Sequence, residues 1–233
     1  MRVTPTLQKN EVRDETYAGL TYHIEGDTVP TLHIELGRRP VYFEHHVLLW
    51  KHSDVNIEVK PLQGAFKRAI AGMSIFVTQA AGPGHIAFSR DGPGQLIAIH
   101  MKKGDRLDVR EHQFLAATDG IDYTFQRVKG AANIFLSGSG LFIDTFDCED
   151  ADEGILWLHG YGNVFEVTLE ANQHIDIEPG GWIYKSPAVT MQTVMQSVSM
   201  GLLASSGQIV FNRFTGPGRV GIQSMYMHMP AGA

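Results

Sequence analysis

One stretch of this chain occurs twice in similar form. Residues 95–124 align without a gap with residues 163–192. The aligned pairs are seldom identical but nearly all apolar, as in Leu96 with Val164, Leu107 with Ile175, Val109 with Ile177, Phe114 with Trp182, and Ile121 with Val189. Such a pattern, kept only at apolar positions, indicates a structural unit that was duplicated.

A weaker third copy lies in the first part of the chain. It aligns Val41 with Leu107, Phe43 with Val109, and Leu48 with Phe114, so the three copies begin near Leu32, Leu96 and Val164. A hairpin-like unit is expected after each copy, two of them around Gly82-Pro83-Gly84 and Gly216-Pro217-Gly218. The last of these has no copy after it, and we therefore expect the C-terminal strands to close onto the first copy, which would leave no open sheet edge.

Period-two alternation of apolar residues is found in almost every segment, for example in 97–101, 164–169 and 220–222, and it predicts β-strands. The expected fold is all-β, with three β-sandwich or double-stranded β-helix-like repeats, pseudo-threefold symmetry and few short helices, the latter at 64–71 and 198–204. We expect a single compact domain over 1–233, built of repeats at about 18–72, 73–138 and 139–207, with 208–233 closing onto the first.

Composition narrows the functional classes. The net charge of −6 argues against a protein that binds nucleic acid through a basic surface. The single cysteine, Cys148, allows no intramolecular disulfide and suggests a reducing compartment. The N-terminal residues are polar, and no apolar run approaches the roughly 20 residues that span a bilayer. The expected location is cytoplasmic, and peripheral membrane association stays open.

Several short segments in a defined order resemble the "altered inheritance of mitochondria" family, which is found widely in bacteria. They are the runs 22–26 (YHIEG), 67–76 (KRAIAGMSIF), 82–84 (GPG), 139–142 (SGLF) and 216–224 (GPGRVGIQS). The resemblance implies β-subdomains similar to the tryptophan RNA-binding attenuation protein, repeated with pseudo-threefold symmetry, and it implies self-assembly. It implies no reaction and no catalytic residues. Where many family members have an acidic-Gly-Ala-Met run, this chain has Glu44-His45-His46-Val47-Leu48.

Histidines are the first candidates for chemistry, since the chain has 11 of them. His46 and His112 align in the repeats, but the third copy has Gly180 at this position. His45 and His46 are adjacent on an expected strand and would point to opposite faces, so they could not easily hold one metal ion. No His-x-His pair is present. Whether His45, His46 and His112 bind anything is left open.

Four other features have simpler explanations. The Gly-Pro-Gly loops at 82–84, 92–94 and 216–218 precede strands rather than helices, so they are expected to be tight turns and not phosphate-binding loops. The acidic stretch Asp144–Glu153 lacks the ligand pattern of a calcium loop and is expected to be a solvated hairpin tip. Asp147 and Glu149 flank Cys148 and disfavour its thiolate. The basic residues Lys102, Lys103, Arg106 and Arg110 have no counterpart in the other copy that would continue a basic belt.

These observations favour a protein that is not an enzyme: a non-enzymatic, self-assembling scaffold or binding protein whose biochemical function is unknown. We assign no catalytic, cofactor-binding or metal-binding residue and expect no cofactor. We expect a homo-oligomer, preferably a trimer, and no nucleic-acid partner. The alternatives are a small-molecule- or metal-binding β-barrel protein and a nucleic-acid-binding ring.

Overall fold

The computed structural model describes residues 4–8, 13–61, 76–127, 142–198 and 207–225 of the 233-residue chain. Within these residues the chain forms antiparallel β-strands and one three-residue 3-10 helix, η1 (His45–Val47). The predicted all-β class is therefore confirmed. The helical turn expected at 64–71 and most of that expected at 198–204 lie outside the described residues. No helix in the described part of the chain is long and apolar enough to cross a membrane.

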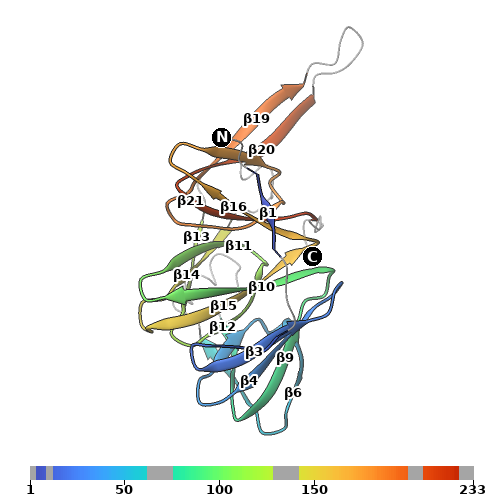
Figure 1. Cartoon of the computed structure of the whole chain (residues 1–233), viewed down its shortest axis with the longest axis vertical. Helices are drawn as coiled ribbons and strands as arrows, with labels where there is room; N and C mark the ends of the chain where they lie inside the picture. The colour runs from blue at the N-terminus through green and yellow to red at the C-terminus, as the bar shows by residue number, and fades with distance from the viewer. Residues whose placement is uncertain (1–3, 9–12, 62–75, 128–141, 199–206, 226–233) are drawn as a thin grey trace.

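Three consecutive segments each contain six strands (Figure 1). The first segment, residues 31–89, contains β4 (Thr31–Leu36), β5 (Val41–Phe43), β6 (Leu48–Lys51), β7 (Asn56–Pro61), β8 (Phe76–Ala81) and β9 (Gly84–Ser89). The second, residues 94–161, contains β10 (Gly94–Lys102), β11 (Arg106–Arg110), β12 (Phe114–Thr118), β13 (Asp122–Arg127), β14 (Phe142–Asp147) and β15 (Glu153–Tyr161). The third, residues 164–223, contains β16 (Val164–Leu169), β17 (His174–Ile177), β18 (Trp182–Lys185), β19 (Thr190–Val198), β20 (Gly207–Thr215) and β21 (Gly218–Gln223).

Strands pair in the same order within each segment. The sixth strand lies between the first and the third, as in β4-β9-β6, β10-β15-β12 and β16-β21-β18. The fifth strand lies between the second and the fourth, as in β5-β8-β7, β11-β14-β13 and β17-β20-β19. A register shift occurs near the start of the third strand in each case, between Leu48/Trp50, Phe114/Ala116 and Trp182/Tyr184. The aligned apolar positions of the sequence thus occupy corresponding strands.

Neighbouring segments share sheets. Each group of three paired strands is called a triplet here. β12 of the second segment pairs with β5 of the first, so that the triplets β10-β15-β12 and β5-β8-β7 form one six-stranded sheet. β18 of the third segment pairs with β11 of the second in the same way, within a seven-stranded sheet. The segments therefore follow one another along the long axis of the molecule, the first at the bottom and the third at the top of Figure 1.

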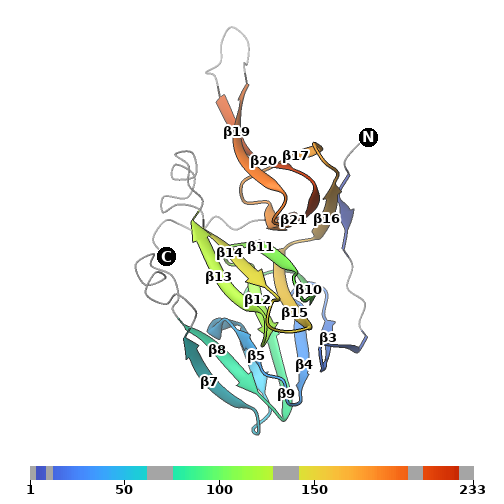
Figure 2. The same ribbon diagram turned by 90° about the vertical axis from the view of Figure 1, so that its left-hand side faces the viewer.

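The N-terminal strands reach both ends of the molecule. β2 (Glu15–Tyr17) and β3 (Leu20–Glu25) extend the sheet of the first segment at β4. β1 (Thr6–Leu7) pairs instead with β16 of the third segment. Figure 2 shows β3 beside the first segment, whereas the short blue strand near the N-terminus, β1, lies beside β16 of the third.

Alternating side chains from the two triplets of each segment meet in a buried core. Leu32 and Phe88 from one triplet of the first segment pack with Val41 and Phe43 from the other. The second core is built around Phe114 and Phe146, and the third around Trp182 and Phe214. Three buried clusters, each centred on one segment, therefore hold the two layers of the fold together.

Two expectations about the chain path need correction. Residues 82–84 and 216–218 form tight turns, as predicted, but these turns do not close hairpins: β8 and β9 belong to different sheets, as do β20 and β21. Each turn carries the chain from one layer to the other, and it packs so closely that a Cβ on Gly82 would lie 2.4 Å from the Leu36 carbonyl oxygen. As a result β9 returns to β4 of its own segment, and β20 and β21 complete the third segment instead of closing onto the first. The segment limits are accordingly 31–89, 94–161 and 164–223.

Candidate functional site

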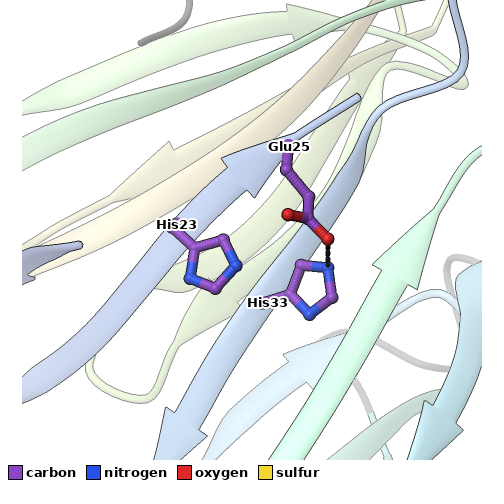
Figure 3. Close-up of side chains that lie close together, drawn as sticks. All are labelled: His23, Glu25 and His33. Atoms are coloured by element: carbon purple, nitrogen blue, oxygen red, sulfur yellow. Dashed lines mark ion pairs between the residues drawn. The ribbon is translucent and has the colours of Figure 1, made fainter. Parts of the chain in front are cut away.

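The outward face of the β3–β4 hairpin carries a compact group of potential ligands. Even-numbered residues of both strands point into the core, for example Tyr22 and Ile34, so the odd-numbered residues face outward. The register places His23 directly opposite His33, and Glu25 lies two residues after His23 on the same face. The hairpin thus brings two imidazoles and one carboxylate together (Figure 3).

The three side chains converge. One ligating atom from each of His23, Glu25 and His33 lies within 4.8 Å of the other two. The two imidazole rings stack with centroids 4.6 Å apart and planes inclined by 14°. His33 Nε2 lies 3.1 Å from Glu25 Oε1, is buried from solvent, and makes no hydrogen bond of good geometry. Imidazole nitrogen and carboxylate oxygen are the ligand set of many zinc sites.

Neighbouring groups contact both rings, and the surroundings of His33 affect its charge. His23 Nδ1 lies 3.0 Å from Asp14 Oδ1. The Trp50 ring approaches His33 from β6, with centroids 5.7 Å apart. Burial, followed by the proximity of His23, lowers the pKa of His33 despite the opposing effect of Glu25. At neutral pH His33 is therefore an uncharged imidazole, which is the form that binds metals.

Sequence analysis did not single out these residues. The signal was available in the run 22–36, where His-Ile-Glu occurs twice, at 23–25 and at 33–35. When the two strands pair antiparallel, the histidine of the first motif lies opposite the histidine of the second. A search limited to His-x-His within one strand could not find a ligand set that two strands supply together.

A second feature is a polar cleft of about 420 Å³ between the N-terminal strands and the second and third segments. Its lining includes Arg13, Glu15, Tyr22, His23, His100, Glu166, Tyr184 and Arg219. The Tyr22 hydroxyl donates to Glu15 Oε2 over 2.7 Å and lies 2.8 Å from His100 Nε2. The Tyr184 hydroxyl donates to Glu166, which also accepts from Arg219. Tyrosine hydroxyls, carboxylates and cationic groups thus line the cleft, although Tyr22 and Tyr184 are themselves largely buried.

The tyrosines of this cleft act as hydrogen-bond donors and not as bases. Burial, together with the adjacent Glu15, raises the pKa of Tyr22. Burial and the charge of Glu166 raise the pKa of Tyr184. Both hydroxyls therefore keep their protons at neutral pH and donate hydrogen bonds to Glu15 and Glu166.

The histidines considered in the sequence analysis lie elsewhere. His45 and His46 belong to η1 and not to a strand, because the chain turns between β5 and β6. The His46 ring is 43% exposed and lies 3.3 Å from Glu44, and the His45 side chain is outside those described. His112 lies in a turn with φ of 70°, is 63% exposed, and has its Nε2 3.7 Å from Glu111. Among the described residues, neither His46 nor His112 belongs to a group of three potential metal ligands.

The other candidates fit their simpler explanations in part. Asp144 and Asp147 of the acidic stretch lie on β14, and Asp144 is buried, so only the turn between β14 and β15 is a solvated tip. Cys148 is buried, and burial is the main cause of its raised thiol pKa, with nearby carboxylates adding to the effect. A thiol of this kind is a poor nucleophile. Lys102 and Lys103 are exposed at the end of β10, while Arg110 is half-buried.

Comparisons with known proteins place the fold in a family. The family model described as "Mitochondrial biogenesis AIM24" matches residues 22–225. An uncharacterized protein of Streptococcus pyogenes serotype M6 is 26% identical over 205 residues, which cover 82% of this chain and 79% of that protein. The X-ray crystal structure of a Streptococcus pyogenes protein matches with a TM-score of 0.65 and 22% identity, over 89% of this chain and 94% of the other. At this identity the match supports the fold alone.

Proposed function

This chain belongs to the mitochondrial biogenesis AIM24 family, and we propose that it is a non-enzymatic protein that associates with further copies of itself, end to end, and presents binding surfaces to partners. The observation that supports this proposal is the way in which neighbouring segments join within one chain. The same joint can be formed once more between two chains.

Both internal joints use the same register. At the first joint, Ala116 pairs with Phe43 and Ala117 with Tyr42. At the second joint the residues at the same aligned positions pair, namely Tyr184 with Val109 and Lys185 with Asp108. The rule is that the third strand of one segment pairs with the second strand of the preceding segment.

In the described part of the chain, one of the third strands and one of the second strands are each paired on one side only. β6 is the third strand of the first segment and the last strand of its sheet, and β17 is the second strand of the third segment and the last strand of its own. The rule would pair them between two chains, with Trp50 opposite Ile177 and Lys51 opposite Asp176. Figures 1 and 2 show that β6 and β17 lie toward opposite ends of the molecule, so the pairing is intermolecular in this proposal.

The side chains at the two edges suit such a joint. Lys51 and Asp176 would repeat the Lys185–Asp108 ion pair, which is buried at the internal joint with Nζ and Oδ2 2.7 Å apart. Ala116 and Tyr184, the counterparts of Trp50, are buried, whereas Trp50 is 47% exposed and its neighbour Leu49 is 56% exposed. Exposed apolar side chains on a free strand edge are typical of a surface that pairs with another chain.

Association requires some present contacts to change. Lys51 Nζ now donates to the Val55 carbonyl over 2.9 Å, and Asp176 holds Arg213 in a bidentate ion pair with both distances 2.7 Å. Lys51 and Arg213 are solvent-accessible side chains, and contacts of this kind contribute little to stability because water screens and replaces them. We therefore expect the exchange of partners to cost little.

Head-to-tail pairing of this kind gives a ring when the rotation per chain closes and a filament when it does not. We propose a closed ring of three chains, in which the three segments of each chain act as successive copies of one unit. No reacting group is required for this function.

Charge reversal at the two edges tests the proposal. Lys51→Glu and Asp176→Lys each place like charges opposite one another, so each variant alone should sediment as a smaller species than the wild type, with at least a tenfold weaker association. The double variant Lys51→Glu, Asp176→Lys should associate again, because every joint then pairs a carboxylate at position 51 with an ammonium group at position 176. Analytical ultracentrifugation of the wild type, the single variants and the double variant measures this.

Lys103→Glu is the matched control, since it makes the same charge change on an exposed turn away from both edges, and it should associate like the wild type. A wild-type protein that is monomeric at all concentrations would contradict self-association. An oligomer that neither variant weakens would place the contact elsewhere on the chain.

The polar cleft favours a second candidate, the binding of a small polar molecule. Its convergent hydroxyl, carboxylate and cationic groups are the kind that orient a ligand in a pocket. A thermal-shift screen of small polar metabolites, repeated with Tyr22→Phe and Arg219→Met, tests this candidate. A ligand that stabilises the wild type but neither variant would support it, and the absence of any stabilising compound would count against it.

A further inference from the structure

We propose that His23, Glu25 and His33 form a binding site for a zinc ion, with water as the fourth ligand. The site uses one nitrogen from each imidazole and one oxygen from the carboxylate. It lies on the outward face of the β3–β4 hairpin, beside Trp50 of β6, and one chain supplies all three of its protein ligands. Two histidines and one carboxylate with an open position are a ligand set that Zn²⁺ takes in proteins.

Strand geometry fixes the backbone of the site. His23 and His33 are a directly paired cross-strand couple, and Glu25 is the next outward residue on β3. Both strands lie inside the five-stranded sheet, since β2 flanks β3 on one side and β9 flanks β4 on the other. The ligands therefore come from rigid elements and not from a loop, which is the arrangement that holds a metal site accurately.

The ligand atoms are close to the spacing that zinc requires. Tetrahedral ligands about 2.1 Å from the metal are about 3.4 Å from one another. One pair, His33 Nε2 and Glu25 Oε1, is already 3.1 Å apart, and no distance in the group exceeds 4.8 Å. The two imidazole rings are nearly parallel, so on binding the His23 ring and the Glu25 carboxylate would rotate about their side-chain bonds to direct their lone pairs at one ion.

Two neighbouring observations point to a ligand and not only to an ion pair. His33 Nε2 is buried and faces Glu25 without forming a hydrogen bond of good geometry, so its lone pair has room for another partner. His23 Nδ1 lies 3.0 Å from Asp14 Oδ1, which leaves Nε2 of that ring for the metal. A carboxylate behind a ligating histidine is a recurring feature of zinc sites, because it fixes the tautomer and raises the basicity of the ring.

Metal titration of the full chain, first treated with a chelator and dialysed, tests the proposal. Isothermal titration with Zn²⁺ should give one strong site per chain. Co²⁺ at the same site should produce the intense visible absorption of tetrahedral coordination, which zinc then removes. His23→Asn, His33→Asn and Glu25→Gln should each weaken zinc binding at least tenfold, and Asp14→Asn should weaken it by about tenfold through its effect on His23.

Two controls separate a specific site from general histidine binding. His112 is an exposed histidine that also lies next to a carboxylate, Glu111, but it belongs to no group of three potential ligands among the described residues. The His112→Asn variant should therefore bind zinc like the wild type. Glu25 is half-exposed, so Glu25→Gln should fold normally, which far-UV circular dichroism verifies. A failure of the wild type to bind zinc, or equal binding by the wild type and the Glu25 and His33 variants, would overturn the proposal.

Discussion

His159 is a titratable side chain held in the interior. It lies on β15, is 1% exposed, and packs edge-on against Tyr161 with ring centroids 4.7 Å apart. Burial, and next the charge of Arg90, lowers the pKa of His159 to about 4. Near pH 6.5, where this imidazole takes up a proton in the unfolded chain, it is therefore still neutral in the folded protein.

His159 should make the protein less stable in acid. Its pKa is about 4 when folded and 6.5 when unfolded, so between these values the unfolded state binds more protons and stability falls as the pH falls. Above pH 6.5 the residue contributes no pH dependence. Between pH 6.5 and pH 4, we expect the His159→Leu variant to lose roughly 2–3 kcal/mol less stability than the wild type. Urea unfolding at several pH values measures the difference, and parallel pH profiles would contradict it.

The joint between β18 and β11 combines a strand pairing with a buried ion pair. Lys185 Nζ donates to Asp108 Oδ2, and both side chains are less than 10% exposed. Asp108 Oδ1 accepts a further hydrogen bond from the Thr145 hydroxyl of β14 over 3.1 Å. If one partner is removed, the remaining charge is either buried without a counter-charge or hydrated by water that enters the joint, and both outcomes destabilise the fold.

Asp108→Ala should therefore destabilise the protein strongly, by about 3–5 kcal/mol, because Lys185 would remain buried without its carboxylate. The double variant Asp108→Leu, Lys185→Met should lose much less, since it removes both charges and keeps the volume. Arg106→Met on the same strand breaks the half-exposed ion pair with Asp147 and should cost less than about 1 kcal/mol. Chemical denaturation of the variants measures these costs, and a double variant as unstable as Asp108→Ala would contradict the explanation.

Strand positions could be predicted from the sequence, but strand partners could not. The sequence alignment of Leu48 with Phe114 and Trp182 marks the start of the third strand in each segment, where the structure has a recurring register shift that the sequence did not predict. Apolar alternation carries this information because each strand buries one face. It does not reveal which distant strand lies alongside, and for that reason the strands after Gly82 and Gly216 were expected to form hairpins although they return to β4 and β16. The His23–His33 pair was missed for the same reason, since it depends on the register of two strands.

At the scale of the whole molecule, the segments share sheets and buried clusters, and we therefore expect them to unfold together. The six-stranded sheet contains strands of the first and second segments, and the seven-stranded sheet contains strands of the second and third. Loss of one segment would expose the paired edge of β5 or β11 and the apolar residues that it covers. The three buried clusters reinforce this dependence, because Trp157 of the second segment packs in the core of the first, and Ile143 in that of the third.

Tryptophan fluorescence can test this dependence, since each segment contains one of the three tryptophans, Trp50, Trp157 and Trp182. We expect the protein to unfold in one transition. In variants that keep a single tryptophan and have phenylalanine at the other two positions, urea unfolding followed by fluorescence should coincide with unfolding followed by far-UV circular dichroism. The comparison is made within each variant, so the stability lost by replacing the buried Trp157 or Trp182 does not affect it. A variant retaining Trp182 whose fluorescence changes at a lower urea concentration than its circular dichroism would show that the third segment unfolds first. In that case the β18–β11 joint, in spite of its buried ion pair, would be too weak to couple the third segment to the other two.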